Sequence, residues 1–329
     1  MAASGGIANV GNTCYLNTSL QCLGHCQAFI KYMLNKEHSN NHPSIISYLH
    51  QMYYELYVNK NNVVPRNMLR YFQENIKLIN IFEQNDINEF LAILIDKLNQ
   101  CVGKSVHITK EALLDKNRYS TSDFDVQRFK MDVDWYEKHS KEYSALVPMF
   151  NGQSISQIVC GSCGKVFHNY ETYMNLMLPI TSKTNNLYDC FDSYFSEEVI
   201  NKDAAVWECS ACKEKVSSRK TVNLWRNPSV LIVSLKRFTN DFRKNNAPID
   251  IPEQLDLSKY SLTQKTNSYR LQAVAYHNGS QNSGHYHAVC RHDDKWFSYD
   301  DMDVCSLKNT PEHKNGYVFF YCLLSLAKD

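Results

Sequence analysis

Two short cysteine pairs constrain the fold of this 329-residue chain more than any other feature. The first pair is Cys160-x-x-Cys163, and the second, Cys209-x-x-Cys212, follows a long intervening segment. Four cysteines in paired knuckles are typical of a structural zinc site, in which thiolates surround the ion tetrahedrally. Such an ion would join the tips of two long β-hairpins that lack a core of their own. Two disulfides or four unrelated thiols are the alternatives.

The cysteine content also bears on the compartment. The first residues, Met1–Gly5, have neither the basic nor the apolar region of a secretory signal. Without such a signal, the twelve cysteines favour reduced thiols, metal ligands or catalysis over disulfides. We therefore expect an intracellular protein, cytoplasmic or nuclear. We also expect a monomer. The formal charge of +1 offers no field for nucleic acid, and the apolar run Val318–Leu324 has only the length of a strand, so we expect no membrane partner.

The order of the hydrophobic patterns predicts an α+β fold. Apolar residues recur with helical spacing before Phe150, and short strands with turns follow it. We expect a loop over 104–132. The predicted helices are Ser44–Val58, one that Pro65 opens, one that begins at Asp86 with a capping-box-like start, and Trp135–Val147. The predicted strands are Val230–Leu235, 271–278, 285–292, 295–300 and 316–324.

The stretch Gly11–Asn17 predicts a turn that leads into a helix. Asn12 or Thr13 can cap this helix, and the apolar residues that follow have helical spacing. Cys14 would then lie in the first turn, where unpaired N–H groups and the helix dipole lower the pKa of a thiol. A thiolate is a nucleophile. An inert, buried cysteine fits this stretch equally well when it is taken alone.

A candidate base lies near the other end of the chain. The strands that begin at Gly284 and Lys295 are joined by Asp293-Asp294, which can form a tight hairpin turn. If residue 292 pairs with 295, His285 lies opposite residue 302, and a bulge or a longer loop would move its partner to Asp300 or Asp301. A carboxylate that binds one ring nitrogen leaves the other for a thiol.

Other histidines compete for this role. His277, His287 and His292 are near in sequence, and His287 shares a strand face with His285. We prefer His285 because Gly284 leaves room for a substrate backbone beside it. The alternative is a surface pair of little energetic value.

These motifs, in this order, resemble the ubiquitin-specific protease family of cysteine deubiquitinases. The stretch Gly6–Gln21 is similar to the family's cysteine box, Ser283–Tyr286 to its histidine box, and Trp296-x-x-Tyr299-Asp300-Asp301 to its acidic end. Gln84–Leu91, Leu235–Phe238 and the CxxC pairs match further landmarks, so the resemblance covers nearly the whole chain. The order cysteine, histidine, aspartate is that of papain-like hydrolases and disfavours a SUMO protease.

The resemblance implies a single catalytic domain over 1–329 with a papain-like hand. Its parts would be a helical thumb over about 1–150, zinc-tipped β-ribbon fingers over about 155–230, and a β-rich palm over about 231–329 with adjoining segments. The implied cofactor is a structural Zn²⁺ ion. The implied partners are ubiquitin and ubiquitinated proteins, and the implied reaction is hydrolysis of the isopeptide or peptide bond after the last glycine of ubiquitin. A Gly-Gly tail passes where a Cβ would clash.

The resemblance also implies roles for single residues. Cys14 would attack the carbonyl, His285 would activate it and later protonate the leaving amine, and Asp300 would orient His285, with Asp301 as the rival orienter. Asn9 matches the position that donates to the oxyanion, although a turn-forming asparagine is the alternative.

Four further positions match residues that bind the substrate: Gln84, Asp86, Phe238 and Tyr286. Asp86 can also cap a helix. The sequence Gln84-Asn85-Asp86 departs from the usual Gln-Gln-Asp of the family.

Two other functions use the same motifs. One is a ubiquitin-binding module with little catalysis, and the other is a protease for another modifier that ends in Gly-Gly.

Overall fold

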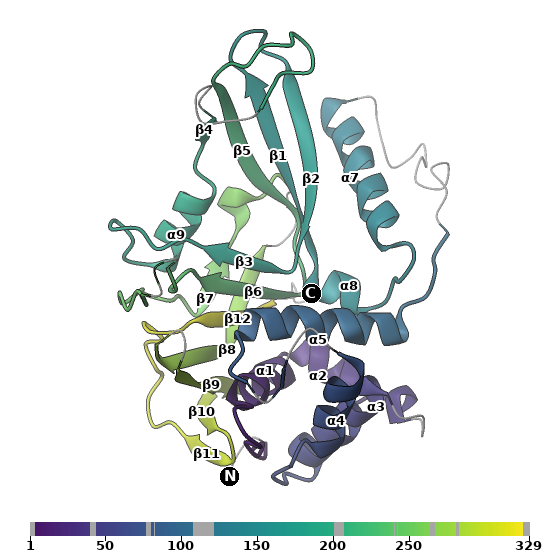
Figure 1. The fold of residues 1–329 in the computed structure, drawn as a ribbon, viewed down its shortest axis with the longest axis vertical. Helices are drawn as coiled ribbons and strands as arrows, with labels where there is room; N and C mark the ends of the chain where they lie inside the picture. The colour runs from purple at the N-terminus through teal and green to yellow at the C-terminus, as the bar shows by residue number, and fades with distance from the viewer. Residues whose placement is uncertain are drawn as a thin grey trace, which may run out of the picture.

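The structure is a computed structural model that describes residues 4–39, 44–76, 80–81, 83–107, 122–200, 207–239, 241, 243–263, 267–280 and 283–324. Most helices lie in the first half of the chain and two β-sheets in the second (Figure 1). The predicted α+β order is therefore confirmed. In the part of the chain that the structure describes, no helix has the length and apolarity needed to cross a membrane.

The helices of the first half begin largely where the sequence predicts. Ser44 caps its helix through the N–H of Ser47, Pro65 stands at a helix start, and Asp86 accepts from the N–H of Asn88 at 2.8 Å. The helices are α1 (Cys14–Gly24), α2 (Gln27–Met33), the 3-10 turn Lys36–Ser39, α3 (Ile45–Tyr53) with a π-helical continuation Tyr54–Val58, α4 (Arg66–Asn75), α5 (Ile87–Val102), α7 (Asp123–His139) and α8 (Leu146–Phe150).

The loop predicted over 104–132 is wrong in its second half. Helix α7 begins there, behind Ser122, whose hydroxyl accepts from the N–H of Asp125 at 3.2 Å. Helix α7 buries few apolar side chains, chiefly Met131 and Trp135, so its helical period is weak in the sequence. The predicted helix Trp135–Val147 is divided between the end of α7 and the start of α8. Residues 108–121 lie outside the described residues.

A four-stranded antiparallel sheet extends away from helices α1 to α5 (Figure 1). Its strand order is β2-β1-β5-β4, and helix α7 lies alongside β2. Arg226 at the base of the sheet bonds Asp132 of α7 at 2.7 Å and covers the ring of Trp135. The strands are β1 (Gly152–Cys160), β2 (Val166–Tyr173), β4 (Glu198–Ile200) and β5 (Ser218–Arg226).

An eight-stranded sheet forms the centre of the molecule. Seven strands follow the order β11-β10-β9-β8-β12-β6-β3, and β7 pairs with β8. All predicted strands are present, and the short strands β3, β7 and β11 are additions. The strands are β3 (Asn175–Leu178), β6 (Val230–Leu235), β7 (Gln254–Asp256), β8 (Ser268–Gly279), β9 (Gly284–His292), β10 (Lys295–Asp300), β11 (Asp303–Ser306) and β12 (Val318–Leu323); the 3-10 turn Ser258–Tyr260 and helix α9 (Leu187–Tyr194) complete the described elements.

Helices cover both faces of this sheet. Val230 and Ile232 of β6 pack in the cluster formed by α1 to α5, while Leu231 and Val233 pack in the cluster that includes α9. Alternate residues of a strand point to opposite faces, so a strand covered on both sides is apolar throughout. This explains why Val230–Leu235 is entirely buried. The same packing places α1 against β8 and β9.

Arg237 follows β6 and is buried, with 1% of its surface exposed. Its guanidinium donates to four backbone carbonyls, those of Asn245, Ala247, Lys314 and Gly316, at 2.8–3.0 Å. No carboxylate contacts it among the described residues. The Arg237 side chain therefore connects the segments 245–247 and 314–316 to the end of β6 through hydrogen bonds to their carbonyls.

We expect Arg237→Leu to lower the free energy of unfolding by about 3 kcal/mol or more, because the buried carbonyls would lose their donors. Urea unfolding would measure this as a lower midpoint with an unchanged slope. Lys236→Leu is the matched control, because Lys236 is exposed and its loss should change stability by about 0.5 kcal/mol or less. Equal losses for the two variants would contradict the prediction.

Candidate active site and metal centre

Cys14 is the first residue of helix α1, as predicted. The turn before it is built by Asn9, whose Oδ1 accepts from the N–H of Gly11 and of Thr13 at 3.1 Å and from the hydroxyl of Thr13 at 3.2 Å. Asn12 has a φ of 55°, a left-handed conformation that asparagine tolerates. Thr13 occupies the N-cap position but makes no side-chain cap bond.

The predicted lowering of the Cys14 pKa is not what the structure shows. Burial raises the pKa of the Cys14 thiol, and the nearby Asp301 carboxylate adds to the rise. The N–H groups of Tyr286, Tyr15 and Cys14 itself lower the pKa, but burial outweighs them. The side chain is 5% exposed. Burial therefore favours the thiol form of Cys14 over the thiolate.

His285 lies at the start of β9, and its partner is Asp300. The His285 Nε2 and Asp300 Oδ1 atoms are 2.5 Å apart. The register predicted for the hairpin is confirmed, because His292 pairs with Lys295. The pairing of β9 with β10 ends at Ala288, so His285 reaches Asp300 diagonally, without the bulge or longer loop that we considered. This leaves Nδ1 for a thiol.

The backbone brings His285 and Cys14 together. The N–H of Tyr286, the residue after His285, donates to the Cys14 sulfur. The rival histidines lie elsewhere. His277 contacts the rings of Phe238 and Tyr286, His287 stacks on Tyr276, and His292 lies beside Asp293 at the far end of the hairpin.

Asp301 makes a separate set of contacts. Its Oδ2 accepts from the Asn9 amide at 2.9 Å, and its Oδ1 accepts from the Asn17 amide at 2.7 Å. Asn9, predicted to donate to an oxyanion, thus uses part of its amide on Asp301. The Cys14, His285, Asp300, Asp301 and Asn9 side chains lie in one region, but only Asp300 bonds His285 among the hydrogen bonds of the described residues.

The residues predicted to bind a substrate tail line the same region. Asp86 caps α5 and accepts from the Tyr317 hydroxyl at 2.7 Å, so its capping role holds. The Tyr286 hydroxyl also bonds the Asp86 carboxylate. Phe238 is partly buried and packs edge-on against Tyr317 and His277.

Gln84 bridges the helical layer and the sheet. Its amide donates to the Gly284 carbonyl at 3.2 Å and accepts from the Gly284 N–H at 3.1 Å. A Cβ on Gly284 would come within 2.1 Å of the His277 ring, so this position requires glycine. The backbone at Gly284, next to His285, is therefore held by Gln84 on one side and packs against His277 on the other.

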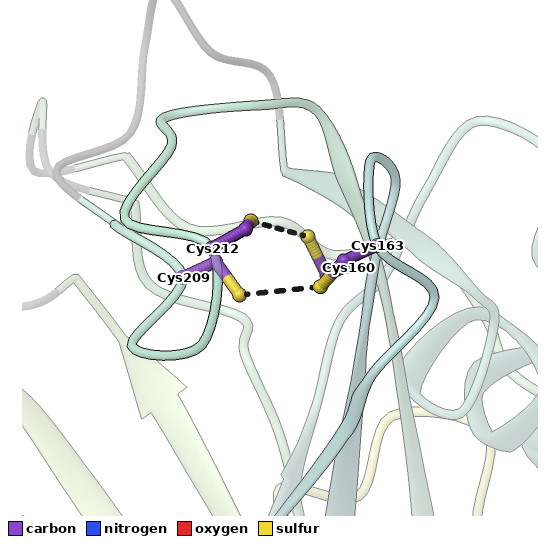
Figure 2. A group of neighbouring side chains, drawn as sticks. All are labelled: Cys160, Cys163, Cys209 and Cys212. Atoms are coloured by element: carbon purple, nitrogen blue, oxygen red, sulfur yellow. Dashed lines mark hydrogen bonds between the residues drawn. The ribbon is translucent and has the colours of Figure 1, made fainter.

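The four predicted metal ligands meet at the far end of the four-stranded sheet (Figure 2). The Cys160 and Cys212 sulfurs are 3.8 Å apart, and the Cys163 and Cys209 sulfurs are 3.7 Å apart. All four are free thiols within 4.8 Å of one another. Backbone N–H bonds, first from Cys212, lower the pKa of Cys209 to about 6. The group could hold a metal ion.

The family comparison agrees with this arrangement. The family described as ubiquitin carboxyl-terminal hydrolase matches residues 5–321. The chain belongs to this family. Usp2 of Drosophila melanogaster, a ubiquitin carboxyl-terminal hydrolase, is 27% identical over 96% of this chain and 34% of its own length. Ubiquitin carboxyl-terminal hydrolase 21 of Homo sapiens is 27% identical over 97% of this chain and 61% of its own length. The chain thus spans about a third to three fifths of these relatives.

A solved structure has the same fold. It is a SAGA DUB module that contains Ubp8 with Sgf11, Sus1 and Sgf73, bound to monoubiquitin. The likeness has a TM-score of 0.75 and 24% identity, and it covers 98% of this chain and 69% of the solved chain. At this identity it shows the fold. The predicted papain-like α+β hand of the family is therefore confirmed.

Two members of the site were not predicted. Asn17 is 2% exposed and bonds Asp301, and Tyr317 bonds Asp86. Asn17 stands one turn after Cys14 on the same face of the helix. A polar residue at this position could have indicated that it belongs to the site. Tyr317 directly precedes the apolar strand β12 and carries no such signal.

Proposed function

We propose that this chain is a cysteine-type deubiquitinase that hydrolyses the bond after the C-terminal glycine of ubiquitin. One observation carries the proposal: the Cys14 sulfur accepts from the N–H beside His285, which itself bonds Asp300. A thiol, an imidazole and a carboxylate in this order form a nucleophile, its base and the group that orients the base. Membership of the family supports ubiquitin as the substrate.

The chemistry follows from these atoms. His285 Nδ1 takes the proton of Cys14, and the thiolate attacks the glycine carbonyl carbon. The oxyanion accepts from the Asn9 amide and from N–H groups near Cys14. The tetrahedral intermediate collapses, the C–N bond breaks, and His285 gives its proton to the leaving amine. Water activated by His285 then hydrolyses the thioester, which releases the ubiquitin carboxylate and restores the thiol.

The tail of ubiquitin would pass between the start of α5 and the start of β9. Gln84 and Asp86 directly precede α5, Tyr286 lies on β9, and Phe238 lies close by. We propose that this passage is narrow. A tail without Cβ atoms fits such a passage, whereas larger side chains clash.

We propose Zn²⁺ as the ion of the cysteine cluster. Zinc–sulfur bonds of about 2.3 Å in a tetrahedron give a sulfur–sulfur edge of about 3.8 Å, which agrees with the 3.7 and 3.8 Å separations here. Cys160, Cys163, Cys209 and Cys212 would hold the ion, and it would cross-link the ends of the long strands. Free thiols at all twelve cysteines support a reducing, intracellular location.

The burial of Cys14, whose side chain is 5% exposed, favours a second candidate, a ubiquitin-binding module with little catalysis. Ubiquitin that carries a cysteine-reactive group at its C-terminus separates the two. We expect intact-mass analysis to find one adduct, on Cys14, and none with SUMO or other Gly-Gly-ended probes run in parallel. Measurable ubiquitin binding without an adduct would favour the binding module. An adduct with another modifier would show that ubiquitin is not the specific substrate.

The orienting role of Asp300 can be separated from that of Asp301 by small-molecule alkylation. A haloacetamide needs the thiolate of Cys14 but forms no oxyanion, so its rate reports on the thiol and its base. We expect Asp300→Ala to lower the alkylation rate about tenfold and the turnover about 10²-fold or more. Asp301→Ala should leave the alkylation rate unchanged or raise it, because the Asp301 charge raises the Cys14 pKa. Slower alkylation in Asp301→Ala alone would identify Asp301 as the orienter.

A further inference from the structure

Asp301 is held by the N-terminal segment at three atoms. Its carbonyl accepts from the N–H of Ile7 at 2.9 Å, and its two carboxylate oxygens accept from Asn9 and Asn17. The residue has a φ of 53°, so its backbone is in the left-handed region. A strained residue with every side-chain oxygen bonded has one arrangement available. The orientations of Asn17 and Asn9 indicate the role of the fixed Asp301 carboxylate.

The orientation of Asn17 is fixed by its neighbours. Its Nδ2 atom lies 3.1 Å from the Ile7 carbonyl and 2.7 Å from the Asp301 carboxylate. Both neighbours are acceptors, so the amide nitrogen has to face them and uses both its hydrogens there. The Asn17 Oδ1 atom is then buried with no hydrogen-bond partner among the described residues. An unpaired buried acceptor destabilises a protein, and a residue chosen only for stability would not leave one.

Asn9 is fixed from the opposite side. Its Oδ1 accepts three hydrogen bonds from Gly11 and Thr13, so the amide cannot flip. One hydrogen of its Nδ2 goes to Asp301. No hydrogen bond shown for the described residues uses its second hydrogen. A continuous chain of hydrogen bonds therefore runs from Asn17 through Asp301 to Asn9.

We propose that Asn17 is a positioning residue for the oxyanion site. Asn17 holds the Asp301 carboxylate, and Asp301 holds the Asn9 amide with its second N–H directed at the oxyanion. The proposal rests on the proposed hydrolase function. It gives the two adjacent aspartates separate tasks: Asp300 serves His285, and Asp301 with Asn17 serves Asn9. A preorganised donor acts on the transition state and not on the bound substrate.

A double-mutant cycle between Asn17→Ala and Asn9→Ala tests this, with ubiquitin that carries a fluorogenic C-terminal amide as substrate. Loss of an oxyanion donor costs about 10²-fold to 10³-fold in kcat, so we expect that loss for Asn9→Ala. We expect Asn17→Ala to lower kcat about tenfold, with KM and haloacetamide alkylation of Cys14 unchanged. In the Asn9→Ala background, Asn17→Ala should cause no further loss.

Ser19→Ala is the matched control, because Ser19 is buried on the same helix and donates only to the Tyr15 carbonyl. It should leave kcat unchanged. If Asn17→Ala fails to fold, Asp301→Asn gives the same cycle, because asparagine tolerates the left-handed backbone. Equal losses in the two backgrounds, or a change confined to KM, would overturn the proposal. A wild-type chain without hydrolysis would instead overturn the proposed function itself.

Discussion

Cys14→Ala is expected to abolish hydrolysis of ubiquitin conjugates while ubiquitin binding is retained. Nucleophile and base act as a unit, so the loss should be about 10⁵-fold or more, and His285→Ala should cost nearly as much. Binding should survive because the thiol is almost entirely buried and contributes little surface. Turnover of the fluorogenic ubiquitin amide measures the first effect, and calorimetric titration with ubiquitin measures the second.

Cys305→Ala is the control for this experiment. Cys305 is an exposed thiol on β11, outside the proposed site, and its removal should change neither turnover nor labelling at Cys14. Hydrolysis that survives in Cys14→Ala would contradict the assignment of the nucleophile. Loss of binding together with turnover would mean that Cys14 supports the fold and would leave its chemical role without support.

The second large effect concerns the metal. Structural zinc contributes about 10–16 kcal/mol in small zinc-dependent domains, and the four-stranded sheet has little core beyond Ile155 and Trp225 to replace it. We expect Cys209→Ser to lose the ion and to unfold the far ends of β1, β2 and β5. Hydrogen exchange should become fast there first, while labelling of Cys14 by a small haloacetamide should persist.

Elemental analysis of the purified protein should find one zinc per chain, and a strong chelator should reproduce the exchange pattern of Cys209→Ser. Cys101→Ser is the control, because Cys101 is an exposed cysteine outside the cluster. A protein that contains no zinc and keeps its exchange protection would contradict the metal assignment. A disulfide would reveal itself by a mass two units lower per bond and by sensitivity to reductant.

Sequence reasoning succeeded where neighbouring residues decide the outcome. The hairpin at Asp293-Asp294 fixes the pairing of His292 with Lys295, because a short turn sets the register of the strands that it joins. Asp86 starts α5 because an N-cap side chain bonds N–H groups two or three residues away. The first part of α7 is predicted as loop because the stability of this helix comes from Arg226 and other contacts with a distant sheet.

The sequence by itself determined the α+β class, the start of α1 at Cys14, the hairpin that carries His285, and the two cysteine knuckles, since each depends on local spacing. Only the tertiary structure decided the direction in which the Cys14 pKa shifts, the choice of Asp300 as the partner of His285, and the chain of bonds from Asn17 to Asn9. Burial of Cys14 depends on a strand more than 250 residues away, and Asp301 meets Asn17 across 284 positions. Desolvation and such contacts depend on which surfaces pack together, and local spacing does not contain that information.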